Sequence, residues 1–175
     1  SLSTFMNAFT ASDFTAYPFS TLNDKDFSNL LSVYLDATFF PNLNELDFMQ
    51  EGHRFDFVEN DKSKDQIVLK GIVYNEMKGA MSSISSQADQ GLNENLFPNH
   101  TYGYNSGGDP QDIPKLTYQN LLEFHKKHYH PSNAIFFTYG KIDIPALQNE
   151  IQINVLKHFS PSAEKIEVIE SKSFR

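Results

Sequence analysis

The segment GIVYNEMKGA, residues 71–80, decides how this chain is interpreted, because it places an acid inside an apolar stripe. In a helix, Glu76 has Ile72 and Val73 one turn before it and Gly79 and Ala80 one turn after it. These small and apolar neighbours predict a carboxylate that faces protein rather than water. A buried carboxylate has to be paired, neutralised or bound to a metal ion.

The residues alone leave the role of Glu76 open between a structural and a chemical one. The structural role is a salt bridge to Lys70, His53 or Arg54 at the edge of the core. By physical argument alone this is the commoner outcome, because most buried carboxylates are paired with a cation. The chemical role is that of a metal ligand.

Composition describes a globular and acidic protein. The 175 residues carry a formal net charge of −8, which disfavours a nucleic-acid partner and suits a basic peptide. The absence of cysteine excludes disulfides, thiolate metal sites and thiol catalysis, and it fits a reducing compartment. No apolar run is long enough to cross a bilayer, so we expect no membrane partner. The amino end does not resemble a signal or transit peptide, and the chain reads as a fragment that starts within a structured region.

The pattern along the chain predicts mixed helices and strands. We expect two short strands around a turn at residues 11–13, and a helix that begins near Asn23 and ends before Pro41. A short helix follows at 43–52, then a strand at 54–59 and a polar loop at 60–65. The helix that contains Glu76 is expected to run on through Met81 and Ile84 towards Leu92.

The second half of the chain predicts a long loop, two helices and one central strand. Residues 98–115 are rich in Gly and Pro and predict the loop, and Thr117 caps the helix that follows. Residues 134–139 have no polar face, which is typical of a strand in the middle of a sheet. A last helix is expected at 143–158 and a loose charged tail after Ser160. The fold class is therefore α+β, with helices packed on a mixed, largely antiparallel sheet.

Other candidate sites are weaker. His125 and His128 lie one turn apart and could share an ion, but His125 continues an apolar stripe and is better interpreted as a hydrogen-bonded core histidine. His130 lies past the helix end. No Gly-x-Ser-x-Gly motif supports serine catalysis, and the glycine-rich stretch at 106–109 lacks the lysine of a phosphate-binding loop. The edge of the first hairpin could accept an extended peptide by strand addition, or it could be an ordinary paired strand.

Several motifs in a fixed order resemble one protein family. They are SLSTFMNAFTASD at 1–13, VYLDA at 33–37, ELDFMQEGHR at 45–54, KGIVYNEMKGAM at 70–81, YNSGGDP at 104–110 and HYHPSNA at 128–134. Together they resemble the presequence-protease branch of the pitrilysin/insulinase-type zinc metallopeptidases, from Ser1 to about Asp143. The resemblance implies part of an α+β domain over residues 1–159, incomplete on its N-terminal side, with a charged tail or linker at 160–175.

The resemblance also implies functional residues. In that family, two histidines of an inverted His-x-x-Glu-His motif and a glutamate on a later helix hold zinc, and Glu76 matches the later glutamate. The family's hairpin edge, which holds the substrate backbone beside zinc, matches Asn7, Ala8, Phe9 and Thr10. Those four residues are therefore the expected peptide-binding residues, and the histidines at 125, 128 and 130 match structural parts of the pattern.

The sequence departs from the family in one respect. It contains no His-x-x-Glu-His, so the general base and two histidine ligands are expected upstream of Ser1, and the chain itself supplies no catalytic residue. One carboxylate does not make a usable zinc site, because such sites need three protein ligands. We therefore expect a parent zinc endopeptidase that degrades unstructured, basic peptides, and an inactive 175-residue chain.

Two alternatives remain on sequence grounds. The first is a non-catalytic relative that holds peptides or has a structural role, and the second is an independent peptide-binding module with Glu76 in a salt bridge.

The resemblance also implies partners and a location. Besides peptides, the partners would be the further domains of the parent chain. The resemblance implies the mitochondrial matrix, or else a plastid or a parasite digestive compartment, and this stretch carries no address of its own.

Overall fold

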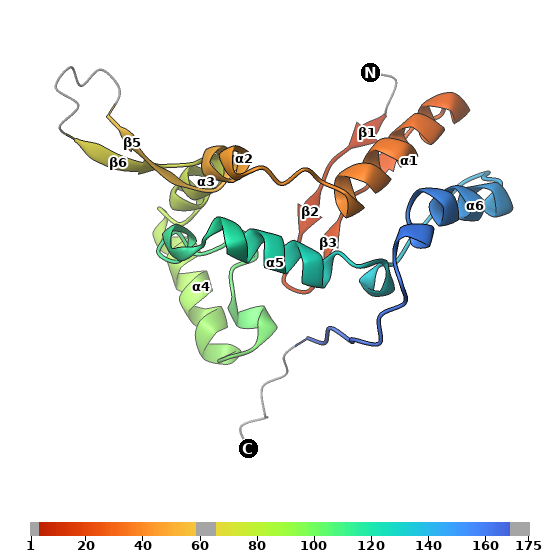
Figure 1. Cartoon of the computed structure of the whole chain (residues 1–175). Coiled ribbons are helices and arrows are strands. Elements are labelled where there is room, and N and C mark those ends of the chain that lie inside the picture. The colour runs from red at the N-terminus through yellow and green to blue at the C-terminus, as the bar shows by residue number, and fades with distance from the viewer. Residues whose placement is uncertain (1–3, 59–65, 169–175) are drawn as a thin grey trace. The chain divides into compact units, whose positions relative to one another are not determined.

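The computed structural model describes residues 4–58 and 66–168, and it has the α+β composition that the sequence predicted. The chain divides into two compact units. Figure 1 labels the helices and strands. Unit 1 comprises Ser1–Phe9, Thr15–Asn42 and Leu122–Glu167, and unit 2 comprises Thr10–Phe14, Leu43–Leu121 and Val168–Arg175. The predicted polar loop at 60–65 and the end of the predicted tail lie outside the described residues.

The chain begins with a hairpin, as predicted. Strand β1 (Phe5–Met6) pairs antiparallel with β4 (Phe19–Ser20), and β2 (Phe9–Thr10) pairs with β3 (Thr15–Ala16). At the tip, the N–H of Ala11 donates to the carbonyl of Phe14 at 2.8 Å. Each arm thus consists of two short strands around the predicted turn.

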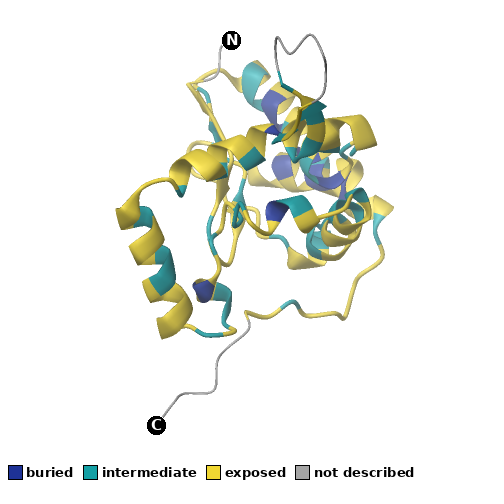
Figure 2. Ribbon diagram, turned by 90° about the vertical axis from the view of Figure 1, so that its left-hand side faces the viewer, coloured by how far each residue is buried: buried dark blue, intermediate teal, exposed yellow. Residues whose placement is uncertain are grey.

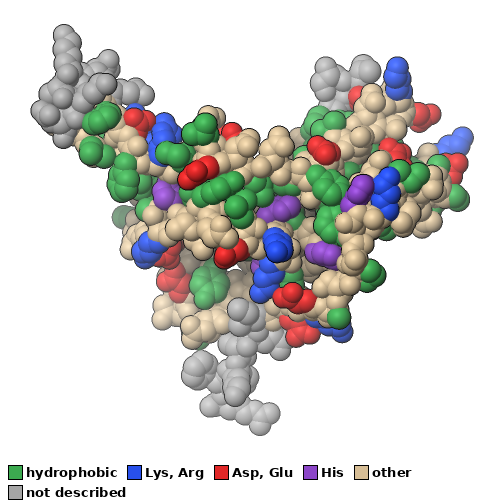
Figure 3. Space-filling view, in the orientation of Figure 1, with side chains coloured by type: hydrophobic (Ala, Val, Ile, Leu, Met, Phe, Trp, Pro, Cys, Tyr) green, Lys and Arg blue, Asp and Glu red, His purple; other side chains and the backbone are tan. Residues whose placement is uncertain are grey.

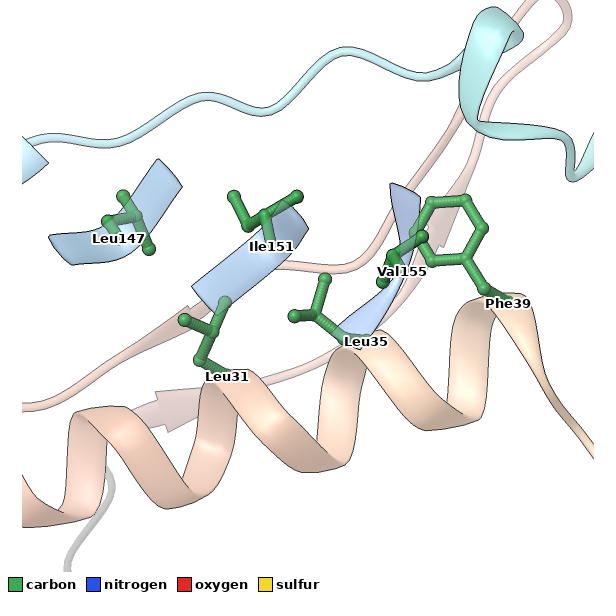
Figure 4. Close-up of a cluster of buried hydrophobic side chains, with 6 residues drawn as sticks. All are labelled: Leu31, Leu35, Phe39, Leu147, Ile151 and Val155. Atoms are coloured by element: carbon green, nitrogen blue, oxygen red, sulfur yellow. The ribbon is translucent and has the colours of Figure 1, made fainter. Parts of the chain in front are cut away.

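Unit 1 is built on two helices, α1 (Asp24–Phe39) and α6 (Ile144–Asn154). Both begin where the sequence predicted, because a side chain caps each: Asn23 accepts from the N–H of Asp26, and Asp143 from that of Ala146. Their facing sides form the main core (Figure 4). Its buried members are Leu31, Leu35, Phe39, Leu147, Ile151 and Val155.

The helix α5 (Tyr118–His128) follows the predicted cap at Thr117. The hydroxyl of Thr117 accepts from the N–H of Asn120 at 3.2 Å, and the side-chain oxygen of Asn120 accepts from the N–H of Thr117 at 2.9 Å. These reciprocal bonds satisfy backbone donors that the first turn leaves unpaired. Short 3₁₀ turns η3 (Pro131–Asn133) and η4 (Leu156–His158) complete unit 1.

The predicted central strand at 134–139 is wrong. The segment has no strand assignment, and Ile135, Phe137 and Tyr139 are 95%, 86% and 93% exposed. A strand with two apolar faces requires neighbours on both edges and cover on both faces. No described residue pairs with this segment as a strand, so its apolar composition does not produce one.

Besides the hairpin tip at Thr10–Phe14, unit 2 contains the helix α2 (Glu45–Glu51) and a ribbon of β5 (Arg54–Phe57) and β6 (Ile67–Lys70). The two strands are antiparallel, with Arg54 opposite Lys70 and Phe57 opposite Ile67. Figure 3 shows apolar side chains at the surface of this ribbon, and Phe55 is 79% exposed. The sequence predicted the first of these strands but not the second.

The predicted long helix through Glu76 is broken. The helix α3 (Ile72–Ala80) ends at Ala80, and α4 (Ile84–Leu96) starts after it. The side chain of Ser83 accepts from the N–H of Ser86 at 3.1 Å and so caps a new helix. The apolar spacing continues across the break. The side chain of Ser83 nevertheless takes a backbone hydrogen bond that a continuous helix would make with a carbonyl, so the helix is interrupted here.

The predicted loop at 98–115 is present and contains only the short 3₁₀ turns η1 (Thr101–Gly103) and η2 (Ile113–Lys115). Figure 2 shows where burial concentrates, and among the described residues most buried apolar side chains belong to α1 and α6, with Ile113 the one in unit 2. No helix in the described ranges is both long enough and apolar enough to span a bilayer.

The core between α1 and α6 makes a direct test possible. Leu35 is 4% exposed, so we expect Leu35→Ala to lower the free energy of unfolding by about 2–4 kcal/mol through lost burial and the cavity left behind. Val33 on the same helix is 58% exposed, and Val33→Ala should change it by less than about 0.5 kcal/mol. Urea unfolding followed by circular dichroism measures both. Equal losses in the two variants would contradict the assigned packing.

Candidate functional site

The structure places Glu76 on α3 with an exposed side chain, so the predicted protein-facing carboxylate is wrong for these residues. The apolar residues one turn before it do not bury it, because Ile72 is 52% and Val73 is 39% exposed. Gly79 and Ala80 on the following turn are exposed as well. The stripe that the sequence suggested is real, but no described segment covers it.

The salt-bridge interpretation of Glu76 is also wrong. Arg54 and Lys70 pair with Asp56, at 3.0 and 3.6 Å between nitrogen and carboxylate oxygen. The Nε2 atom of His53 lies 2.7 Å from the carbonyl oxygen of Leu116. Among the described residues, the carboxylate of Glu76 has no ion pair, and it stays available to a ligand.

Close contacts at two glycines hold α3, the helix that carries Glu76, against neighbouring segments. A Cβ on Gly71, the residue before α3, would overlap the backbone of Gly52, whose carbonyl accepts from the N–H of Tyr74 at 3.3 Å. Glycine therefore allows the end of α2 and the start of α3 to touch. A Cβ on Gly107 would overlap the sulfur of Met77, so the loop also lies close against α3.

The four predicted peptide-binding residues, Asn7 to Thr10, are all exposed. The N–H of Asn7 donates to the carbonyl of Pro18 across the hairpin at 3.1 Å, and the N–H of Ala8 donates to the side chain of Asn7 at 2.9 Å. The rings of Phe5 and Phe9 stack with centroids 6.3 Å apart. This arm therefore pairs on one side with the hairpin and has solvent-exposed side chains.

An apolar hollow of about 230 Å³ lies beside this arm within unit 1. Asn7 and Ala8 line it together with Val33, Tyr34 and Ala37 of α1 and with Tyr17. The hydroxyl of Tyr34 donates to the carbonyl of Asn7 at 3.4 Å. The arm is thus attached to α1 beside the hollow.

Tyr17, which lines the apolar hollow, is paired with a second tyrosine, Tyr129. The hydroxyls of Tyr17 and Tyr129 are 2.6 Å apart, and their rings meet edge to face at 6.2 Å. Burial, followed by this hydrogen bond, raises the pKa of Tyr17 above its ordinary value. Tyr17 therefore stays neutral and contributes a hydrogen-bonding wall rather than a charge.

Three histidines in the second half of the chain make hydrogen bonds or ring contacts with described residues. The Nε2 atom of His125 lies 2.9 Å from the carbonyl oxygen of Thr38, which confirms the predicted hydrogen-bonded histidine. His128 stacks on Phe124 at 4.2 Å, and burial, together with Lys127, lowers its pKa. The Nδ1 atom of His130 accepts from the N–H of Ser132. Within residues 4–58 and 66–168, no group of three or more His, Asp or Glu side chains could hold a metal ion.

The sequence did not reveal a second hollow, of about 420 Å³, within unit 2. Its lining combines Ala80 of α3, Asp89, Gln90 and Asn93 of α4, and Tyr102 and Asn105 of the loop, and it is called the polar hollow below. The available signal was a run of polar residues at helical spacing, since Asp89, Gln90 and Asn93 share one face of α4.

The predicted site residues belong to different units. Glu76 and Thr10 are in unit 2, whereas Asn7, Ala8 and Phe9 are in unit 1. Each group is therefore described within its own unit. The apolar hollow accompanies the hairpin arm, and the polar hollow accompanies the helix of Glu76.

The Asp56 cluster has an expected pH dependence. The backbone N–H of Phe57, then Arg54 and Lys70, hold the pKa of Asp56 below its ordinary value of 3.8. A lowered folded-state pKa stabilises the fold above pH 3.8, and this contribution is lost as the pH falls through the folded value. We expect a carbon-13 NMR titration of the Asp56 carboxyl to have its midpoint below 3.8, and Arg54→Gln to raise it. A wild-type midpoint at or above 3.8 would contradict the cluster.

The exposure of Glu76 has its own test. Because the carboxylate is exposed and unpaired among the described residues, Glu76→Gln should change the free energy of unfolding by less than about 0.5 kcal/mol. Asp56→Asn is the matched control and should lower the urea midpoint, since Asp56 accepts from Phe57 and Arg54. A loss of about 1 kcal/mol or more in Glu76→Gln would indicate a pair that the structure does not contain.

Comparison with known proteins agrees with the sequence motifs. The profile of the family described as "Peptidase M16 inactive domain" matches residues 115–173. The mitochondrial presequence protease of Xenopus laevis is 55% identical over 159 residues, which cover 91% of this chain and 16% of that protein. That of Schizosaccharomyces pombe is 54% identical over 144 residues, which cover 82% of this chain and 14% of that protein.

A bacterial relative extends the match over almost the whole chain. Protein HypA of Clostridium perfringens is 45% identical over 176 aligned residues, which cover 99% of this chain and 18% of that protein. The chain thus spans less than a fifth of the length of these relatives. The identity and the order of the motifs establish that it belongs to the presequence-protease branch of the peptidase M16 family.

Proposed function

We propose that this chain is part of a zinc-dependent endopeptidase, to which it contributes one metal ligand and the strand edge that pairs with a peptide substrate. The observation that carries the proposal is the 55% identity to a mitochondrial presequence protease over 91% of the chain. Residues 1–159 would form part of the peptidase domain, and 160–175 would lead out of it.

Glu76 suits the metal in donor type but not in number. Its carboxylate oxygen is a zinc ligand of ordinary kind, and it is exposed and without an ion pair among the described residues. A zinc site needs three protein ligands, so the other two and the general base would come from a His-x-x-Glu-His motif outside these residues. When bound, zinc supplies Lewis acidity and an activated water at neutral pH.

The hairpin arm at Asn7, Ala8, Phe9 and Thr10 would hold the substrate backbone. An extended peptide can add to an exposed strand edge through main-chain hydrogen bonds, and the side chains of these four residues are exposed. Alternate side chains of an added strand point to the same face. One of them would enter the apolar hollow that Val33, Tyr34 and Ala37 line.

The substrates would be unstructured and basic peptides. Strand addition needs an extended backbone, which a folded protein does not offer, and the net charge of −8 attracts positive charge. The names of the mitochondrial presequence proteases among the relatives support a mitochondrial location, and we propose the matrix. The remaining domains of the parent protein would be the other partners.

The proposal predicts separate outcomes for the parent protein and the chain. We expect Glu76→Gln in the full-length protein to lower zinc-dependent cleavage of an unstructured peptide by at least about a hundredfold, because the substitution removes a proposed direct ligand of the zinc ion. Cleavage is measured by mass spectrometry, and bound zinc by atomic absorption. We expect the isolated 175-residue chain not to cleave.

Two results would contradict the proposal. Wild-type turnover and zinc content in Glu76→Gln would remove the ligand assignment. Zinc-dependent cleavage by the isolated chain would remove the requirement for residues outside it. Glu45→Gln on α2 is a suitable control, since it makes the same change of charge at another exposed helix position.

A non-catalytic role is the second candidate, and the inactive-domain profile over residues 115–173 favours it. In that case the hairpin arm would hold peptides without cleavage. The full-length wild-type protein separates the two candidates. If the role is non-catalytic, it would leave the same peptides intact, and removal of zinc by a chelator would not change its affinity for them.

A further inference from the structure

The tip of the first hairpin, Thr10–Phe14, belongs to unit 2, whereas the rest of the hairpin belongs to unit 1. The N–H of Ala11 donates to the carbonyl of Phe14 and so closes the tip. The side chains of the tip are at most partly buried, and Phe14 is 59% exposed. A segment with few buried apolar contacts opens easily, so the position of this tip depends on its polar contacts.

One polar contact joins the tip to the loop at 98–115. The hydroxyl of Tyr102 donates to the carboxylate of Asp13 at 2.7 Å. Within residues 4–58 and 66–168, it is the one side-chain hydrogen bond between the tip and another segment. A bond to an ionised acceptor is stronger than one between neutral groups. This bond, ahead of burial, raises the pKa of Tyr102, so the hydroxyl keeps its proton at neutral pH.

Tyr102 is itself held in place by α4 and by its own loop. Its ring stacks on His100 with centroids 5.0 Å apart and meets Phe97, at the end of α4, edge to face at 6.3 Å. Its N–H donates to the Nδ1 atom of His100 at 3.2 Å. The next residue, Gly103, accepts through its carbonyl from the side chain of Gln90 at 3.0 Å. The hydroxyl that meets the tip therefore has a fixed support.

The same loop also lies against the helix of Glu76. A Cβ on Gly107 would overlap the sulfur of Met77, the residue that follows Glu76 on α3. Ser12 of the tip lines the polar hollow together with Met77 and Tyr102. The hairpin tip, the loop and α3 thus surround one hollow within unit 2.

We propose that the hydrogen bond between Tyr102 and Asp13 is a positioning contact, which holds the end of the substrate edge, at Thr10, against the loop that borders α3. The bond thereby sets the register of a paired peptide, that is, which of its peptide bonds lies at Glu76. An extended peptide advances about 3.3 Å per residue, so a shift of the tip by that distance presents a neighbouring bond. The inference rests on the peptidase function proposed above.

The distribution of cleavage positions in the full-length protein tests this register. An unstructured peptide is digested, and all products are quantified by mass spectrometry. Tyr102→Phe keeps the ring and removes the hydroxyl. We expect it to lower cleavage at the main position by at least about tenfold and to raise the share of cleavage at neighbouring bonds. A loss of folded protein alone would lower all products by one factor and leave their ratio unchanged.

Two further sets of variants test the bond itself. Tyr104→Phe is the matched control, because Tyr104 lies in the same loop and is 65% exposed, and it should behave as the wild type. Asp13→Asn keeps an oxygen that accepts from Tyr102 and should stay close to the wild-type distribution, whereas Asp13→Ala should reproduce that of Tyr102→Phe. Combining Tyr102→Phe with Asp13→Ala should add nothing, because both remove the same bond. An unchanged distribution in Tyr102→Phe overturns the proposal, and so do fully additive effects in the double variant.

Hydrogen exchange separates this proposal from the function on which it rests. Exchange of the backbone amides at 10–14 is measured by mass spectrometry on the full-length protein without a peptide. We expect Tyr102→Phe to accelerate it about tenfold, because the tip then opens more often. If the wild-type protein cleaves nothing, the peptidase function fails, and the exchange rate alone decides whether the contact holds the tip. Zinc-dependent cleavage with unchanged exchange and unchanged products retains the peptidase and overturns the positioning contact alone.

Discussion

The packing of α1 against α6 is the interaction on which the proposed substrate edge depends. Leu35 and its neighbours on α1 are buried against α6, and each such side chain contributes about 1.5–3 kcal/mol. The other flank of α1 holds the hairpin, because Tyr34 packs on Phe19 with ring centroids 5.0 Å apart and donates to the carbonyl of Asn7. A substitution in the core between α1 and α6 would therefore also move the hairpin arm.

The sequence predicted well those features whose causes are local. Helices begin at Asn23, Thr117 and Asp143, because each side chain can reach a backbone N–H two or three residues further along. The hairpin was predicted as well, because the turn that joins its strands is also formed by residues close in sequence. Ser83 shows the limit of this approach, because its cap also acts locally, yet the apolar spacing across residues 81–84 concealed it. The apolar periodicity predicted one continuous helix there, whereas the Ser83 cap predicts a new helix start, and the structure has the new start.

Features that depend on distant neighbours were not predicted. Residues 134–139 have the composition of a central strand, but a strand exists only through its partners, and Phe137 is 86% exposed. The exposure of Glu76 has the same origin, because composition within α3 cannot show whether another segment covers that face. Asp89 was overlooked because it becomes notable only when the loop at 101–106 folds over α4 and forms the polar hollow.

Glu76 and Asp89 pose the same electrostatic problem and differ in what can solve it. Both are exposed acids of unit 2 without an ion pair among the described residues, so each favours a cation. A zinc ion needs several anionic or imidazole ligands that converge, and under the proposed function Glu76 would gain them from residues outside those described. Beside Asp89 the polar hollow has amide side chains, of which the side-chain oxygen of Asn105 already accepts from the N–H of Gly107 at 3.0 Å. One exposed carboxylate therefore favours a cation without selecting it, and the number of ligands that converge decides whether a metal ion can bind.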